Sequence, residues 1–148
     1  MKHTLGGEIL TALILETFRL NGRLLAAGDR LTRPSGQSSA RWQVLGAVEQ
    51  GALPVAEIAR RMGLTRQSVQ RTADLLVTDG LLKFRDNPSH RRAKLVVLTP
   101  RGESILSEIT RRQVGWSNRL AKDLPPKDLE TAVRLLGEVR RRLGTARS

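Results

Sequence analysis

The 148-residue sequence contains no cysteine and no tyrosine, and aromatic residues make up only 3% of it. Without cysteine, the chain has no disulfide, no cysteine-ligated zinc site and no thiol redox sensor. With so few aromatic residues, its core must consist mostly of Leu, Val, Ile and Ala. The sequence also lacks an apolar run near the ~20 residues that cross a bilayer, and no segment resembles a signal peptide. We therefore expect a cytoplasmic protein with no membrane partner.

Acidic residues are scarce beside basic ones. Lys and Arg number 26 against 14 Asp and Glu, which gives a net charge of +12 and an isoelectric point near 11.6. This balance favours a polyanionic partner, either nucleic acid or an anionic membrane surface. From charge alone, a merely solvated basic surface is the alternative. The length and the 39% of hydrophobic residues suit one domain, or one domain with an oligomerisation element.

Residues for catalysis are also few. The two histidines, His3 and His90, lie near the N-terminus and in a predicted turn. No Ser-His-Asp order, metal-ligand cluster or phosphate-binding glycine loop is present. The sequence therefore predicts no catalytic site, no metal and no cofactor, and an enzyme is the least favoured class.

Residues 55–80 are typical of a helix-turn-helix. Pro54 can open a short helix over residues 55–62, and Gly63 suits the left-handed turn between two packed helices. Thr65 is the predicted N-cap of a second helix that runs from Arg66 to about Asp79. We expect this second helix to enter the major groove of duplex DNA.

The second helix divides into an apolar and a polar face. Val69, Ala73, Leu76 and Val77 recur at helical spacing and are expected in the core. Arginine can bond guanine and glutamine can bond adenine, while hydroxyls suit phosphate contacts. The alternative is a solvated amphipathic helix. The DNA-contacting residues predicted here are Thr65, Arg66, Gln67, Ser68, Gln70 and Arg71.

A basic hairpin follows the second helix. Residues 81–85 and 94–98 alternate in polarity around an Asn-Pro-Ser turn, which predicts two strands with a long tip. Arg85, Arg91 and Arg92 surround this tip, together with Lys94. An arginine at such a tip can enter a narrow minor groove. The alternative is a set of edge charges that prevents strand pairing.

Further helices are predicted on both sides of this region, and a loop is predicted over residues 28–36 because Gly, Pro and Ser recur there. The predicted helices cover residues 8–27, 39–50 (with Trp42, Leu45 and Val48 at helical spacing), 100–122 after a Thr99–Pro100 start, and 127–143 after the Pro125–Pro126 break.

The first and the last two of these helices are too apolar to stand alone. They can pack on one another within the chain or form a dimer interface, since DNA readers of this size commonly dimerise. We therefore predict an N-terminal dimerisation helix and loop over residues 1–37. A DNA-binding domain over 38–100 and C-terminal dimerisation helices over 101–148 follow.

Three segments resemble the MarR family of bacterial winged helix-turn-helix regulators: ARWQVLGAV, VAEIARRMGLTRQSVQRTADLLVTDGLL and RDNPSHRRAKLVVLTPRGESIL. The resemblance covers roughly residues 38–106. It implies a mostly α fold with a small β-hairpin wing and terminal helices that interlock two copies. It also implies two lobes on successive major grooves of a pseudo-palindrome. By this resemblance, residues 66–71 are the recognition segment and Arg92 is the wing arginine.

The resemblance also raises two questions of detail. The wing of the family usually reads Asp-x-Arg, and His90 stands here at the Asp position, with Asp86 or Asp79 as substitutes. Many members are repressors released by a small phenolic or anionic ligand between the dimer helices and the DNA-binding lobe. The residues suggested for that crevice are Arg19, Arg41, Trp42 and Trp116, with the alternative that Trp42 is core and the arginines are surface.

Together these patterns indicate a homodimeric, sequence-specific DNA-binding regulator, a repressor that a small aromatic or anionic effector modulates. Two alternatives stay open. One is an architectural DNA-binding protein without ligand control, and the other is a winged helix that binds an acidic protein.

Overall fold

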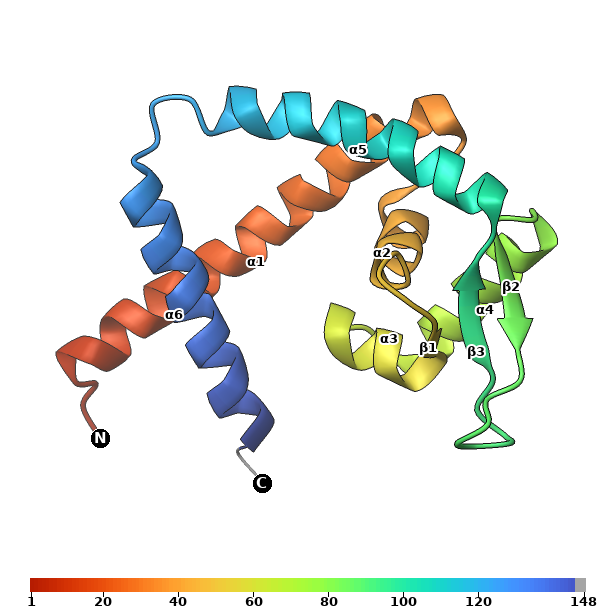
Figure 1. Cartoon of the computed structure of the whole chain (residues 1–148). Helices are drawn as coiled ribbons and strands as arrows, with labels where there is room; N and C mark the ends of the chain where they lie inside the picture. The colour runs from red at the N-terminus through yellow and green to blue at the C-terminus, as the bar shows by residue number, and fades with distance from the viewer. Residues whose placement is uncertain (146–148) are drawn as a thin grey trace. The chain divides into compact units, whose positions relative to one another are not determined.

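Six α-helices, one short 3-10 helix and three short strands follow one another in the computed structural model, which describes residues 1–145 (Figure 1). They are α1 (Leu5–Thr32), η1 (Arg33–Ser35), α2 (Ser39–Ala47), β1 (Leu53–Pro54), α3 (Val55–Met62), α4 (Arg66–Thr78), β2 (Leu82–Arg85), β3 (Leu95–Leu98), α5 (Pro100–Leu120) and α6 (Pro126–Thr145). The predicted class, mostly α with a small β-hairpin wing, is confirmed. None of the helices within residues 1–145 has both the length and the apolar character needed to cross a bilayer.

The chain forms two units, Met1–Gln113 and the part from Val114 onward, and each is described by itself. The first contains all three strands and the helix-turn-helix. The second contains the end of α5 and α6.

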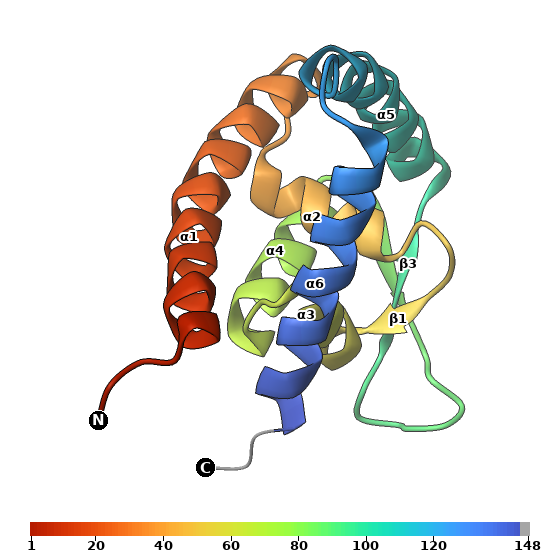
Figure 2. The same ribbon diagram turned by 90° about the vertical axis from the view of Figure 1, so that its left-hand side faces the viewer.

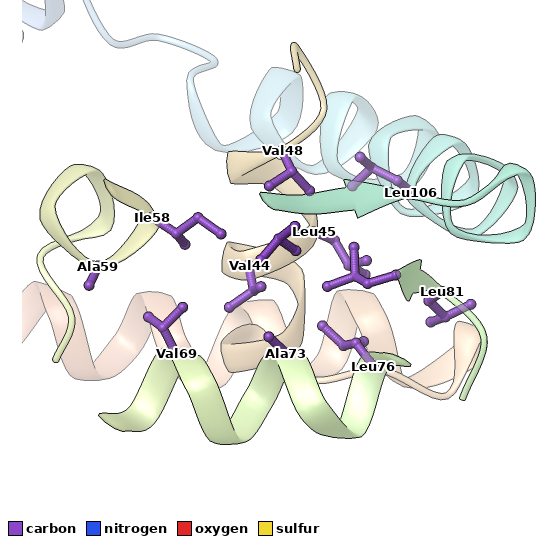
Figure 3. Close-up of a cluster of buried hydrophobic side chains, with 12 residues drawn as sticks. Val44, Leu45, Val48, Ile58, Ala59, Val69, Ala73, Leu76, Leu81 and Leu106 are labelled. Atoms are coloured by element: carbon purple, nitrogen blue, oxygen red, sulfur yellow. The ribbon is translucent and has the colours of Figure 1, made fainter. Parts of the chain in front are cut away.

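The core of the first unit lies where α2 packs against α3 and α4 (Figure 3). Val44 and Leu45 of α2 are buried against Ile58 of α3 and Val69 of α4. Val77, which we expected in the core, is half-buried and packs at the edge of this cluster. Every buried member of the cluster is Val, Leu, Ile or Ala, as the composition predicted: Val44, Leu45, Val48, Ile58, Ala59, Val69, Ala73, Leu76, Leu81, Leu82, Val96 and Leu106.

The sheet has the strand order β1-β3-β2, with both pairs antiparallel. The predicted hairpin is confirmed, because β2 and β3 pair from Leu82 opposite Leu98 to Arg85 opposite Leu95. The short strand β1, in which Leu53 pairs with Val96, was not predicted from the sequence. Two residues are too few for an alternating pattern, and proline is tolerated in a strand at the edge of a sheet. Pro54 is also the N-cap residue of α3.

The predicted loop over residues 28–36 is wrong, because α1 continues to Thr32 and η1 follows it. Gly28 does not break the helix. Instead it lets α2 approach, since a Cβ at this position would lie 2.1 Å from the hydroxyl oxygen of Ser39. The buried hydroxyl of Thr32 donates to the carbonyl of Gly28 at 2.8 Å and so stays paired inside the helix. The left-handed residue that ends this region is Gly36, at φ 70°.

The start of α5 is joined to the end of the helix-turn-helix through Thr99. Its hydroxyl accepts a hydrogen bond from the backbone N–H of Gly102 at 3.1 Å and donates to the carbonyl of Gly80 at 2.7 Å. The backbone N–H of Thr99 also donates to the carbonyl of Leu81 at 3.1 Å. The predicted cap at Thr99 is therefore confirmed, and it fixes α5 directly to the segment between α4 and the hairpin.

Candidate nucleic-acid interface

The turn between α3 and α4 has the predicted geometry. Gly63 has a φ of 66°, in the left-handed region that glycine adopts without strain. Leu64 donates its N–H to the carbonyl of Ala59 at 2.9 Å and closes the turn. Thr65 then caps α4, and its hydroxyl oxygen accepts the N–H of Ser68 at 3.1 Å. These contacts fix the direction in which α4 leaves the turn.

The polar face of α4 is exposed while its apolar face is buried. Arg66, Gln67, Gln70 and Arg71 are all exposed. Val69 is buried at 1% exposure, so the helix cannot rotate without breaking the core. The structure thus presents the four long polar side chains of the predicted recognition segment to the outside.

Thr65 and Ser68 are engaged with each other. The hydroxyl of Ser68 donates to the backbone carbonyl of Thr65 at 3.0 Å, in addition to the cap described above. The proton of Ser68 is therefore used within the helix end, whereas the cap leaves the proton of Thr65 unused. Phosphate contacts by these two residues stay a prediction.

A groove of about 620 Å³ lies between the start of α4 and the hairpin. It brings Arg92 of the hairpin tip together with Arg66, Gln67 and Gln70 of α4. The groove thus combines apolar residues with cationic and amide side chains. Its remaining lining residues are Pro54, Val55, Ala56, Phe84, Ala93 and Lys94.

The two adjacent arginines of the tip line different hollows. Arg91 lines a second hollow, of about 580 Å³, together with Asp86, Asn87 and Pro88. Of these two arginines, Arg92 is the one that lines the groove beside α4, and Arg71 and Arg85 line neither of the two hollows. The tip, which projects beyond α3 and α4 in both views (Figures 1 and 2), therefore presents its two arginines in different surroundings.

His90 closes the turn at the tip. The backbone N–H of Ala93 donates to both Nδ1 and the backbone carbonyl of His90, each at 3.2 Å, and the backbone N–H of His90 donates to the carbonyl of Asn87 at 3.2 Å. The side chain of Asn87 accepts the N–H of Ser89 at 3.0 Å. His90 therefore accepts a backbone hydrogen bond, as a carboxylate would at the same position.

The resemblance implies a carboxylate beside the wing arginine, and Asp79 was suggested for that role. Asp79 caps α4, and one of its oxygens lies 2.5 Å from a guanidinium nitrogen of Arg41 on α2. This ion pair joins α2 to the end of α4. Asp79 is therefore bonded to Arg41 rather than to Arg92, and Asp86 lines the same hollow as Arg91.

A charge cluster on α3 was not predicted from the sequence. Arg60 and Arg61 both donate to the carboxylate of Glu57, with contacts of 2.5–3.0 Å from Arg60 and 2.9 Å from Arg61. These hydrogen bonds lower the pKa of Glu57 to about 2, and the bond from Arg60 has the larger effect. The same pairing with Glu57 raises the pKa of Arg60. Residues three and four apart on a helix are neighbours, so the spacing was a signal that could have revealed this cluster.

A second missed residue is Asp74 on α4. Its Oδ1 accepts a hydrogen bond from Nε2 of Gln70 at 2.9 Å. The same four-residue spacing is the sequence signal, and it places a carboxylate beside a predicted base-reading side chain.

The four residues suggested for an effector have separate surroundings. Arg19 is exposed on α1, 3.7 Å from Glu16, and Arg41 is held by Asp79. Trp42 is half-buried against the core, and Trp116 lies in the second unit. None of the four lines either hollow described above. Their role in ligand binding stays a prediction.

The chain is similar in sequence and in fold to known proteins. Residues 35–93 match the sequence model of the MarR family. An uncharacterized protein of Mycobacterium tuberculosis is 42% identical over 121 residues, which cover 82% of this chain and 85% of that protein.

Two of the similar solved structures each cover most of the chain. A MarR family transcriptional regulator from Streptomyces coelicolor is 25% identical, with a TM-score of 0.73 over 93% of this chain and 97% of that one. The transcriptional regulator MosR of M. tuberculosis, solved in complex with DNA, is 22% identical, with a TM-score of 0.73 over 88% of this chain and 96% of that one.

Proposed function

This chain belongs to the MarR family of winged helix-turn-helix transcription regulators, and from that premise we propose that it acts as a homodimeric repressor. Each copy reads one half of a pseudo-palindromic operator in double-stranded DNA. Residues 38–100 bind DNA, and residues 1–37 and 101–148 join the two copies. We place this activity in the cytoplasm, where the operator is accessible.

The groove between α4 and the hairpin is the observation that carries the DNA-binding proposal. Arg66, Gln67 and Gln70 line one side of it and Arg92 and Lys94 line the other. Such a groove suits a DNA strand, since α4 can read bases in the major groove while the tip contacts the adjacent backbone or minor groove. The complex of MosR with DNA supports the proposal through its similar fold.

We propose that all of the DNA-contacting residues predicted from the sequence do contact DNA, each group in its own way. Arg66, Gln67, Gln70 and Arg71 contact bases or phosphates from α4. Thr65 and Ser68 contact phosphates at the start of the helix, where backbone N–H groups favour anions. Arg85, Arg91 and Arg92 contribute from the hairpin.

A charge-matched pair of double variants tests the groove. Arg66→Ala with Arg92→Ala removes two charges from the groove, and Arg134→Ala with Arg140→Ala removes two from exposed positions on α6. Because α6 belongs to the proposed dimerisation region, sedimentation must show that the second variant keeps the oligomeric state of the wild type. We expect the first variant to lose about tenfold or more in DNA affinity and the second to lose about twofold. Equal losses would show that the groove contributes only its charge. No loss in either would favour a winged helix that binds an acidic protein.

The exposed apolar residues of α1 support the homodimer. Isolated exposed leucines are ordinary, but a long helix that exposes many apolar side chains marks an interaction site. A second copy offers the same surface, so a two-fold symmetric contact buries both. The exposed apolar residues of α1 are Leu5, Ile9, Leu10, Leu13, Ile14, Leu15, Phe18, Leu20, Leu24 and Leu25.

Sedimentation of full-length variants tests the dimer. Phe18 is 71% exposed, so Phe18→Asp leaves the chain folded and should shift it toward the monomer. Asn21→Asp adds the same charge at an exposed polar position of α1 and should leave the dimer intact. A wild-type protein that sediments as a monomer at micromolar concentration would contradict the homodimer.

We retain the effector as a separate part of the proposal. A small aromatic anion would bind near Arg19, Arg41, Trp42 and Trp116 and weaken operator binding. Since Trp42 and Trp116 are the two tryptophans of the chain, their fluorescence reports on such binding. Titration with benzoate should quench the tryptophan fluorescence of the wild type, and the Trp42→Phe variant should show a smaller decrease in fluorescence. Unchanged fluorescence and operator affinity at millimolar benzoate would favour a regulator without this control.

A further inference from the structure

The recognition helix α4 carries a single acidic residue, Asp74, within the sequence RQSVQRTADLLVT. Asp74 is exposed, and its Oδ1 accepts a hydrogen bond from Nε2 of Gln70 at 2.9 Å. Gln70 is also exposed and lines the groove between α4 and the hairpin. A carboxylate on a helix that approaches phosphates repels them. Asp74 therefore does not contribute to DNA binding by attracting phosphates, and the hydrogen bond that it accepts from Gln70 indicates a role there instead.

The hydrogen bond fixes which way round the amide of Gln70 lies. An ionised carboxylate only accepts hydrogen bonds, whereas an amide offers an accepting oxygen and a donating NH₂ group. If the amide were reversed, Oε1 would face the carboxylate of Asp74 and the two acceptors would repel each other. Nε2 therefore stays on the side of Asp74 and Oε1 stays on the opposite side. One Nε2 proton is used by Asp74, and Oε1 and the second proton remain available.

We propose that Asp74 is a positioning residue that sets the order in which Gln70 presents its acceptor and its donor to a base edge. This inference rests on the proposed function, in which α4 reads DNA. Adenine presents its N6 donor beside its N7 acceptor in the major groove, and a glutamine amide bonds both. An amide held in one orientation can form both hydrogen bonds with an adenine on one strand. It cannot form both with an adenine at the same position on the other strand, because the donor and the acceptor then lie in the reverse order. Asp74 thereby selects A·T over T·A at the base pair that Gln70 reads.

Three simpler roles for Asp74 make different predictions. Gln–Asp pairs at this spacing stabilise a helix, and that role leaves base preference unchanged. Repulsion of phosphates lowers the affinity for every sequence equally. A direct contact from Asp74 to the N4 amino group of cytosine gives a base preference that does not depend on Gln70.

A double-mutant cycle on the full-length protein separates these roles. Wild type, Gln70→Ala, Asp74→Ala and the double variant are measured against an operator and against the same operator with each A·T pair reversed in turn. We expect the wild type to prefer one orientation at one pair of each half-site by about fivefold or more. Gln70→Ala should lose this preference, and Asp74→Ala should reduce it about threefold or more. The double variant should match Gln70→Ala.

Glu49→Ala is the matched control, because it removes a carboxylate from an exposed position outside α4. It should leave the orientation preference unchanged. Circular dichroism confirms that each variant remains folded.

Two results would overturn the positioning role while leaving the proposed function intact. One is an Asp74→Ala variant that keeps its orientation preference, whether its affinity for all sequences is unchanged or rises by one common factor. The other is an Asp74→Ala change that alters base preference equally when Gln70 is already alanine. A wild type that binds duplex DNA without any sequence preference would overturn the proposed function itself, and that outcome is visible before any variant is made.

Discussion

Gly28 of α1 and Ser39 of α2 are in contact at a point that leaves no room for a side chain on the glycine. A Cβ on Gly28 would lie 2.1 Å from the hydroxyl oxygen of Ser39. That hydroxyl donates to the carbonyl of Leu25 at 2.6 Å, and the N–H of Ser39 donates to the carboxylate of Asp29 at 2.8 Å. The start of α2 is therefore bonded directly to the last turns of α1. Through this contact, the helix that we propose to join two copies supports the helix that contributes Val44 and Leu45 to the core.

We predict that Gly28→Ala destabilises the protein by about 1–3 kcal/mol, because the added methyl group displaces the Ser39 hydroxyl from its hydrogen bond to Leu25 and presses on the Ser39 Cβ, 3.3 Å away. Gly46→Ala is the matched control, since it lies inside α2 and a Cβ there meets nothing within 4 Å. It should be neutral or stabilise by up to about 1 kcal/mol through its higher helix propensity. Denaturant unfolding measures both variants, and equal stabilities would contradict the close contact.

The carboxylate of Glu57 gives a prediction for pH. Its pKa is lowered from 4.5 to about 2 in the folded protein by hydrogen bonds from Arg60 and Arg61. A lowered pKa stabilises the fold above pH 4.5, and this contribution is lost as the pH falls through about 2. Glu57→Gln should therefore be less stable than the wild type at pH 7, and the difference should shrink steadily below pH 4.5. A difference in unfolding free energy that is independent of pH would show that Glu57 acts by packing instead.

The two arginines of the hairpin tip should differ in their effect on DNA binding. Arg92 lines the groove beside α4, whereas Arg91 lines the hollow with Asp86. We predict that Arg92→Ala weakens binding by about 1–2 kcal/mol, chiefly at sites with A·T-rich flanks, where the narrow minor groove attracts arginine. Arg91→Ala serves as the charge-matched comparison and should cost less. Electrophoretic mobility shifts on A·T-rich and G·C-rich flanks measure both, and equal losses would remove the special role of Arg92.

The turn closed by His90 gives a prediction for the order of the tip. His90→Ala removes Nδ1, one of the two acceptors that the N–H of Ala93 has at 3.2 Å, and leaves the backbone carbonyl of His90, so amide hydrogen exchange at Ala93 should become about twofold faster. His90→Asp supplies a short carboxylate that can accept the same N–H, and should restore the slow exchange. Unchanged exchange in His90→Ala would show that the imidazole does not hold the turn.

The sequence was sufficient to predict the elements of the DNA-binding region because each has a strong local signal. Gly63, Thr65 and the spacing from Val69 to Leu76 placed the turn, the cap and the buried face of α4 correctly. The same local logic failed at Gly28, where the reason for glycine is contact with a residue eleven positions later in the chain. It also failed for β1, whose two residues become a strand only by pairing with Leu95 and Val96.

In the candidate site, too, features with a local sequence signal were predictable and features that depend on tertiary contacts were not. Exposure of Arg66, Gln67, Gln70 and Arg71 could be predicted from helical periodicity. The different surroundings of Arg91 and Arg92 depend on how the tip folds. The pairing of Arg41 with Asp79 depends on how α2 packs against α4. These relationships are tertiary, so no spacing in the sequence reveals them.

Selection of bound duplexes from a random library, with the full-length protein at about 150 mM salt, tests the central claim most directly. At this ionic strength, non-specific binding to phosphates is partly suppressed. The account predicts a two-fold symmetric consensus whose half-sites are one helical turn apart, about 34–36 Å between centres. Retention of DNA with no enriched sequence would contradict it and indicate an architectural DNA-binding protein.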